Sequence, residues 1–171
     1  SIQINKVSVS KSIINGCSGD MFAYKESTVA QIPVTEITNS TLIKPQGRIF
    51  YAGNAASFSI DYCTMYGWGG SKAMLELGDK NTLGMSLAIK NTILANGGSN
   101  RKAHNANAAA NLSLTIEKVY GTNDMTFHST LGDVTKYDKP STEVFENPEE
   151  GNFKIIDALF PSSIGDPRWT E

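Results

Sequence analysis

The fold class is decided by two stretches, Val7-Ser-Val9-Ser-Lys-Ser-Ile13-Ile14-Asn-Gly-Cys17 and Ala56-Ser-Phe58-Ser-Ile60-Asp-Tyr62-Cys63. In both, apolar residues recur at every second position, which is the period of a β-strand with one buried face. Each stretch ends in a cysteine. The pattern predicts β-strands at both places.

Strand patterning continues along most of the chain. The candidate strands are Gln3–Val9, Ser12–Cys17, Val29–Ile37, Gly47–Tyr51, Ser57–Cys63, Ala73–Leu77, Gly84–Ile89, Asn111–Tyr120 and Asn152–Ile156. Gly, Asn, Asp and Pro clusters separate them and predict turns. We identify no internal repeat. Short strands with turns between them are typical of an all-β sandwich or barrel.

Size and composition set the limits of the interpretation. A chain of 171 residues suits one domain. Its net charge of -2 provides no field that would attract nucleic acid or anionic lipid, so we expect neither partner. The apolar runs are far shorter than the roughly 20 residues of a membrane span. The start, Ser1-Ile-Gln-Ile4, has no signal-peptide pattern, which fits either a processed mature chain or a removed initiator Met.

The pattern changes beyond about Thr122, where Pro-containing turns become frequent. We therefore predict a β-sandwich domain over residues 1–122 and a turn-rich C-terminal extension over residues 123–171. The extension either wraps this domain or a neighbour, or forms a loosely ordered tail.

Catalytic and metal-binding patterns are missing from the sequence. The two histidines, His104 and His128, lack the paired spacing of zinc ligands. The adjacent carboxylates Glu149 and Glu150 lie in a Pro/Gly turn, where solvation explains them. No nucleophile, phosphate-binding or dinucleotide motif occurs. We expect a protein that is not an enzyme and has no metal site and no cofactor.

An aromatic segment, Tyr62-Cys-Thr-Met-Tyr66-Gly-Trp68-Gly-Gly70, is a candidate binding loop. Exposed Tyr66 and Trp68 would stack on a sugar or bury at a partner surface. The alternative, which we favour, is that Tyr62 and Tyr66 pack over the cysteines while Trp68 covers the end of a barrel.

Cys17 and Cys63 also have two interpretations. A disulfide between them would indicate an oxidising compartment. It would close a loop of roughly 47 residues and stabilise the fold by on the order of 4 kcal/mol. The alternative is two buried free thiols that act as small apolar residues in a cytosolic or virion protein. We favour the disulfide.

The segments Val7–Cys17, Val29–Val34 and Phe58–Cys63 resemble the first half of a chaperone–usher pilus (fimbrial) subunit. The resemblance covers about residues 7–63 and implies an incomplete immunoglobulin-like Greek-key sandwich that lacks one strand. In that family the gap is filled by an N-terminal strand of the next subunit, a form of β-augmentation. The resemblance implies a donor strand formed by Ile2, Ile4, Val7 and Val9. It also implies an assembly chaperone as a partner.

Three hypotheses about function follow. The first is a structural subunit that self-assembles with its own copies into an extracellular, cell-surface filament by β-strand exchange. The second is a viral or phage structural protein, a coat or tail subunit, in which both thiols are free. The third is a lectin-like binding module that uses Tyr66 and Trp68.

Overall fold

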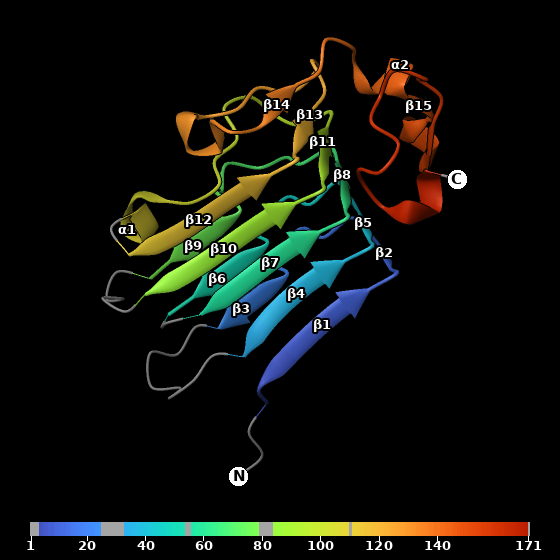
Figure 1. Ribbon diagram of the computed structural model, residues 1–171. Coiled ribbons are helices and arrows are strands. Elements are labelled where there is room, and N and C mark those ends of the chain that lie inside the picture. Colours follow the sequence, from blue (N-terminus) through green and yellow to red (C-terminus); the bar gives the residue numbers. More distant parts are fainter. Residues whose placement is uncertain (1–3, 25–32, 54–55, 79–83, 110, 171) are drawn as a thin grey trace.

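The chain winds into a coil in which each turn contributes up to three short β-strands (Figure 1). The computed structural model describes residues 4–24, 33–53, 56–78, 84–109 and 111–170. Strands pair with the equivalent strand of the next turn, and these pairs are all parallel. This architecture is a parallel β-solenoid, and each turn is called a coil below.

Three parallel sheets run along the solenoid. Sheet A consists of β1 (Lys6–Ser10), β4 (Val34–Thr38), β7 (Ser57–Asp61), β10 (Met85–Lys90) and β12 (Leu112–Glu117). Sheet B consists of β2 (Ile13–Asn15), β5 (Thr41–Ile43), β8 (Thr64–Tyr66), β11 (Ile93–Ala95), β13 (Tyr120–Gly121) and β14 (Thr135–Lys136). Sheet C consists of β3 (Phe22–Tyr24), β6 (Phe50–Ala52) and β9 (Leu75–Leu77). A short helix, α1 (Ala106–Ala109), follows in the fourth coil.

The all-β prediction is confirmed, but the immunoglobulin-like Greek-key sandwich is wrong. That sandwich requires antiparallel strands, whereas sheets A, B and C are parallel. Alternation of apolar and polar residues only shows that one strand face is buried. It does not say which strand lies beside which, so the same pattern fits both architectures. Each of the nine candidate strands overlaps an observed strand; the missed β3, β5, β8, β11, β14 and β15 (Phe145–Asn147) have three residues or fewer.

The solenoid contains an internal repeat that the sequence analysis missed. One inward row of sheet A consists of Val9, Ile37, Ile60, Ile89 and Ile116, whose members lie 28, 23, 29 and 27 positions apart. The uneven spacing hides the repeat from a search at a fixed period. The three central isoleucines are fully buried, and burial of each side chain is worth about 1.5–3 kcal/mol. The two end members are only partly buried.

The corner between sheets A and B has the same backbone conformation in every coil. The residues there have positive φ values of 44–51°, and they are Lys11, Asn39, Tyr62, Asn91 and Lys118. We call this row the corner ladder. Side-chain hydroxyls next to it join the coils: Ser40 Oγ accepts from the Ser12 backbone N–H at 3.1 Å and donates to the Thr38 carbonyl at 2.7 Å. These contacts explain why Ser or Thr recurs after the corner residue.

The C-terminal segment packs on the outer side of sheet B (Figure 1). It contains α2 (Ser141–Val144), the antiparallel hairpin of β15 and β16 (Asn152–Ile155), η2 (Pro148–Glu150) and η3 (Pro167–Trp169). The short η1 (Ser129–Leu131) precedes β14, and its Leu131 packs in the solenoid core. Phe145, Phe153 and Phe160 pack against Tyr66 and Ile93 of sheet B. All residues of β8 and β11 are therefore buried, so these strands do not alternate.

Polar contacts also attach this segment. The Asp124 carboxylate accepts hydrogen bonds from Ser141 Oγ and Thr122 Oγ1, both at 2.5 Å. Burial opposes ionisation of Asp124, but these hydrogen bonds outweigh it and lower the carboxyl pKa. Among the described residues, no helix is long and apolar enough to cross a membrane.

Candidate functional site

Both cysteines are free thiols, so the disulfide that the sequence analysis favoured is absent from the structure. They lie at different corners and two coils apart, because Cys17 follows β2 and Cys63 follows the corner ladder in the third coil. Cys63 takes the place that Ser40 occupies one coil earlier, and its Sγ donates to the Ile37 and Asp61 carbonyls at 3.5 and 3.3 Å. Burial raises the pKa of the Cys63 thiol to about 12.

The candidate exposed binding loop at Tyr66 and Trp68 is wrong, because both side chains are fully buried, as the favoured packing interpretation expects. Trp68 packs in the solenoid core. Tyr66 Oη donates to Glu149 Oε1 at 2.5 Å and accepts from Asn96 Nδ2 at 2.6 Å. Burial and the contact with Glu149 raise the Tyr66 pKa to about 12. Of the three rings in that segment, only Tyr62 reaches solvent.

The predicted donor residues fall in different environments. Val7 and Val9 lie in β1, which pairs with β4 of the same chain. Ile4 precedes β1 and is 59 % exposed. Ile2 lies outside the described residues.

The histidines make local contacts. His128 Nδ1 accepts from the Thr130 backbone N–H at 3.2 Å and caps η1. His104 Nδ1 lies 2.9 Å from the Asn105 carbonyl oxygen. Within the described part of the chain, no group of three or more His, Cys, Asp or Glu side chains is arranged to hold a metal ion.

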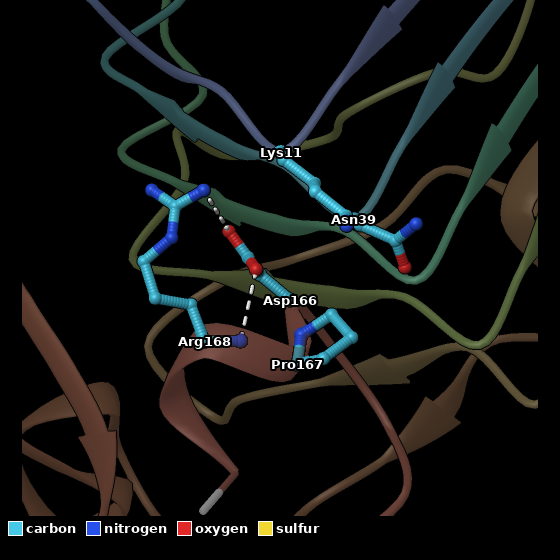
Figure 2. Close-up of a pocket in the computed structure, with 5 residues that line it drawn as sticks. All are labelled: Lys11, Asn39, Asp166, Pro167 and Arg168. Carbon is cyan, nitrogen blue, oxygen red and sulfur yellow. Dashed lines mark hydrogen bonds and ion pairs between the residues drawn. The ribbon is translucent and has the colours of Figure 1, made fainter.

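A pocket of about 430 Å³ lies where the C-terminal turn approaches the corner ladder (Figure 2). Two ladder residues, Lys11 and Asn39, form one side of it. Three residues of η3 and its N-terminus, Asp166, Pro167 and Arg168, form the other side. The pocket thus joins residues more than 120 positions apart in the sequence.

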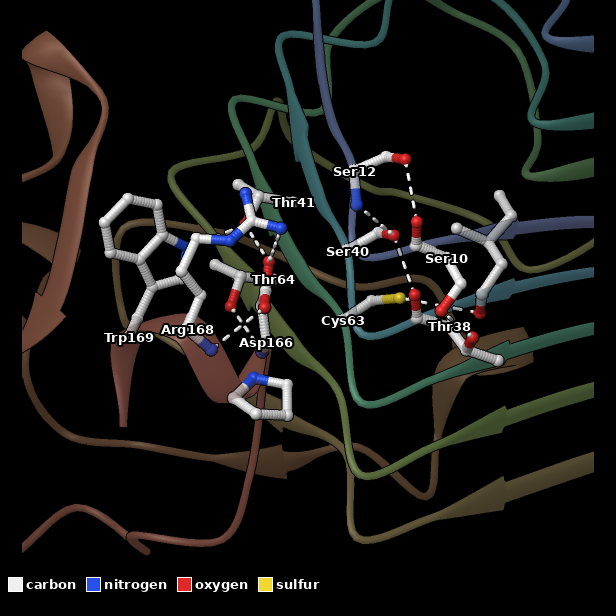
Figure 3. Close-up of polar contacts among 12 residues, drawn as sticks. Ser10, Ser12, Thr38, Ser40, Thr41, Cys63, Thr64, Asp166, Arg168 and Trp169 are labelled. Atoms are coloured by element: carbon white, nitrogen blue, oxygen red, sulfur yellow. Dashed lines mark hydrogen bonds and ion pairs between the residues drawn. The ribbon is translucent and has the colours of Figure 1, made fainter. Parts of the chain in front are cut away.

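Asp166 holds the C-terminal turn in place (Figure 3). Its side chain is almost fully buried, and Oδ2 accepts from Thr41 Oγ1 at 2.7 Å. Oδ1 accepts from the Arg168 backbone N–H at 3.1 Å, while the Asp166 N–H donates to Thr64 Oγ1 at 3.1 Å. Trp169 Nε1 donates to the same Thr41 hydroxyl at 2.7 Å. Asp166 is therefore a positioning residue for the pocket.

The pocket has a surplus of positive charge. Arg168 Nη2 lies 3.6 Å from Asp166 Oδ2, which leaves most of its guanidinium donors available. Among the described residues, no carboxylate lies within ion-pair distance of the exposed Lys11. Two cations thus face one carboxylate that is already hydrogen-bonded. Such a site suits an anionic group, because Arg and Lys make charge-assisted hydrogen bonds to carboxylates.

Hydrogen-bonding groups without charge border the two cations. The Asn39 side-chain amide has no hydrogen bond to the described residues, so both its donors and its acceptor face the pocket region or solvent. The hydroxyls near the same corner are already paired within the protein (Figure 3), since Ser12 Oγ donates to the Ser10 carbonyl and Thr38 Oγ1 donates to Ser10 Oγ. The site therefore combines two cations with the amide of Asn39.

The sequence analysis missed this site because its residues show no local motif. The sequence analysis singled out neither Lys11 nor Asn39, and residues 166–168 fall in the predicted turn-rich C-terminal extension. A repeat alignment of the five corners could have shown that Lys11 and Asn39 occupy equivalent positions. It could not have placed Arg168 beside them.

The fold and the pocket define the protein as a parallel β-solenoid with one sheet covered by its own C-terminal hairpin and a basic pocket at one corner. Residues 58–169 match the family model described as "Domain of unknown function (DUF5123)", and the chain belongs to this family because the match covers more than half of it. The matched part comprises the last three coils and the C-terminal segment. No curated protein and no solved structure matches the chain.

Proposed function

We propose that this protein is a non-enzymatic binding module for an acidic saccharide. The ligand carboxylate lies between Lys11 and Arg168, and the Asn39 amide pairs with ring hydroxyls. The proposal depends on one observation, the pocket of about 430 Å³ with two cations and one hydrogen-bonded carboxylate. Its volume falls in the range of roughly 300–1,000 Å³ that is common for small-molecule sites. The proposed function keeps the hypothesis of a lectin-like binding module, but Lys11, Asn39 and Arg168 replace Tyr66 and Trp68 as the binding residues.

A titration with uronate-containing oligosaccharides tests the proposal. The variant Lys11→Asn removes one cation, and Asn tolerates positive φ better than Lys does. The matched control is Lys44→Asn, because Lys44 is also exposed and also has φ of 51° but lies at another corner. We expect acidic oligosaccharides to bind, neutral ones of the same length to bind more weakly, and only Lys11→Asn to reduce affinity. Equal binding by both variants would refute this placement.

A second candidate function is self-association through the first coil. Within the described sheets, β1, β2 and β3 each have a strand neighbour on one side only. Ile4 and Ile13 beside this edge are 59 % and 49 % exposed. Unpaired strand edges with apolar residues favour pairing with another chain. This observation supports self-assembly by edge pairing, and the product would be an extracellular filament or a virion subunit array.

Sedimentation velocity and electron micrographs test self-association. Ile4→Asp places a charge beside the first coil, whereas Leu159→Asp places one on the C-terminal segment, where Leu159 is 80 % exposed. We expect Ile4→Asp to abolish the larger species and Leu159→Asp to leave them unchanged. A wild-type chain that stays monomeric at all concentrations would remove this candidate.

A further inference from the structure

The corner ladder extends the pocket into a continuous row. Each of the first four members donates its backbone N–H to the residue that precedes the next member: the N–H of Lys11 donates to the Thr38 carbonyl at 3.2 Å, and the N–H of Asn91 donates to the Glu117 carbonyl at 3.0 Å. Neighbouring parallel strands lie about 4.8 Å apart, so the five ladder positions span about 19 Å. The row begins at the pocket and runs along the solenoid axis to Lys118.

The side chains along this row are cationic at the two ends, aromatic in the middle and amides in between. Exposed lysines, Lys11 and Lys118, lie at its two ends. Tyr62, which is 39 % exposed, lies in the middle. Asn39 and Asn91 lie between them. Cations, an aromatic ring and amides are the groups that bind carboxylates, stack on apolar ring faces and pair with hydroxyls.

The residue types at these positions provide a second argument. Positive φ suits Asn, and a Lys or Tyr there is under more steric strain. Asn39 and Asn91 need no further explanation. Lys11, Tyr62 and Lys118 adopt the same conformation without this advantage. Lys44 at another corner has the same φ value, so what distinguishes Lys11, Tyr62 and Lys118 is that they lie exposed in one row with the pocket at its end.

The acidic residues next to the row already have partners. Asp61 Oδ1 accepts from Asn91 Nδ2 at 2.8 Å. Glu117 Oε2 lies 2.9 Å from Lys90 Nζ. Lys90 therefore balances the charge of Glu117, whereas the neutral Asn91 amide leaves Asp61 charged, so the row carries Lys11 and Lys118 against Asp61.

We propose that the ligand is an extended acidic oligosaccharide that lies along the corner ladder across all five coils. This inference rests on the proposed function, because the first carboxylate is the one bound at Lys11 and Arg168. A sugar ring stacks on Tyr62, and a distant carboxylate pairs with Lys118. The pocket is then one end of the site rather than the whole of it.

The experiment compares a monouronate with uronate oligomers that exceed the length of the row, using calorimetry. We expect affinity to rise with length until the row is filled. Lys118→Asn should weaken the long oligomer about two- to fivefold, as for exposed ion pairs, without affecting the monouronate. Tyr62→Asn should also weaken only the long ligand. Asn suits positive φ, so these variants retain the fold, and Lys44→Asn is the control.

The outcomes separate this inference from the proposed function. Binding that depends on Lys11 but not on length, Tyr62 or Lys118 would overturn the extended site and keep the pocket. No binding at any length would overturn both. Equal affinity for a single-stranded oligonucleotide of the same charge would overturn the saccharide as the ligand of the row. Length dependence together with selective loss in Lys118→Asn would support the inference.

Discussion

Replacement of Phe153 by Ala should destabilise the whole protein strongly. Phe153 is fully buried between the C-terminal hairpin and sheet B. Its ring centroid lies 5.2 Å from that of Tyr66, 5.5 Å from that of Phe145 and 5.8 Å from that of Trp169. Truncation of a buried Phe to Ala costs about 3–5 kcal/mol, which includes the cavity left behind. That is a large part of the roughly 5–15 kcal/mol that stabilises a typical domain.

Urea unfolding followed by circular dichroism and by tryptophan fluorescence measures this loss. Leu159→Ala is the matched control, because Leu159 belongs to the same segment and is 80 % exposed. We expect the control to change the unfolding free energy by about 0.5 kcal/mol or less. A loss below about 1 kcal/mol for Phe153→Ala would refute the conclusion that this segment completes the core over sheet B.

Three further results are expected. Gly70→Ala should lower the melting temperature more than Gly16→Ala, since both have positive φ but only at position 70 would a Cβ overlap a neighbouring backbone oxygen. In native protein at pH 8, mass spectrometry should find Cys17 alkylated and Cys63 unmodified, because burial raises the Cys63 pKa to about 12. The folded protein lowers the pKa of Asp124, so ionised Asp124 stabilises the fold at pH values above the ordinary carboxyl pKa of 3.8. This stabilisation is lost as the pH falls below 3.8, so in Asp124→Asn the free energy of unfolding should depend less on pH in that range.

Much of the strand content could be predicted from local patterns. The stretch Leu112–Glu117 alternates because one face packs on the core and the other meets solvent, and this holds in any one-sided sheet. The strands β8 and β11 could not be found this way. Both of their faces are buried, one by the solenoid core and the other by the C-terminal segment, so they do not alternate.

The candidate site was less accessible to sequence analysis. Aromatic residues in a Gly-rich segment left two interpretations of Tyr66 and Trp68 open, an exposed binding loop and the favoured buried packing. Such a composition suits exposed stacking and buried packing equally, and only the tertiary contacts show that both rings are interior. The disulfide could not be tested in the sequence either. Cys17 and Cys63 both follow a strand pattern, but this pattern does not give the distance between the two thiols in the folded protein.

Local patterns in the amino-acid sequence specify short β-strands separated by tight turns, because alternation and turn residues act over a few neighbouring positions. The tertiary structure alone decided that these strands stack in parallel and that Arg168 lies beside Lys11. Pairing between coils depends on contacts between residues 23–29 positions apart, and the pocket depends on a contact across most of the chain. No local pattern specifies such partners, since they are selected by the packing of the whole core.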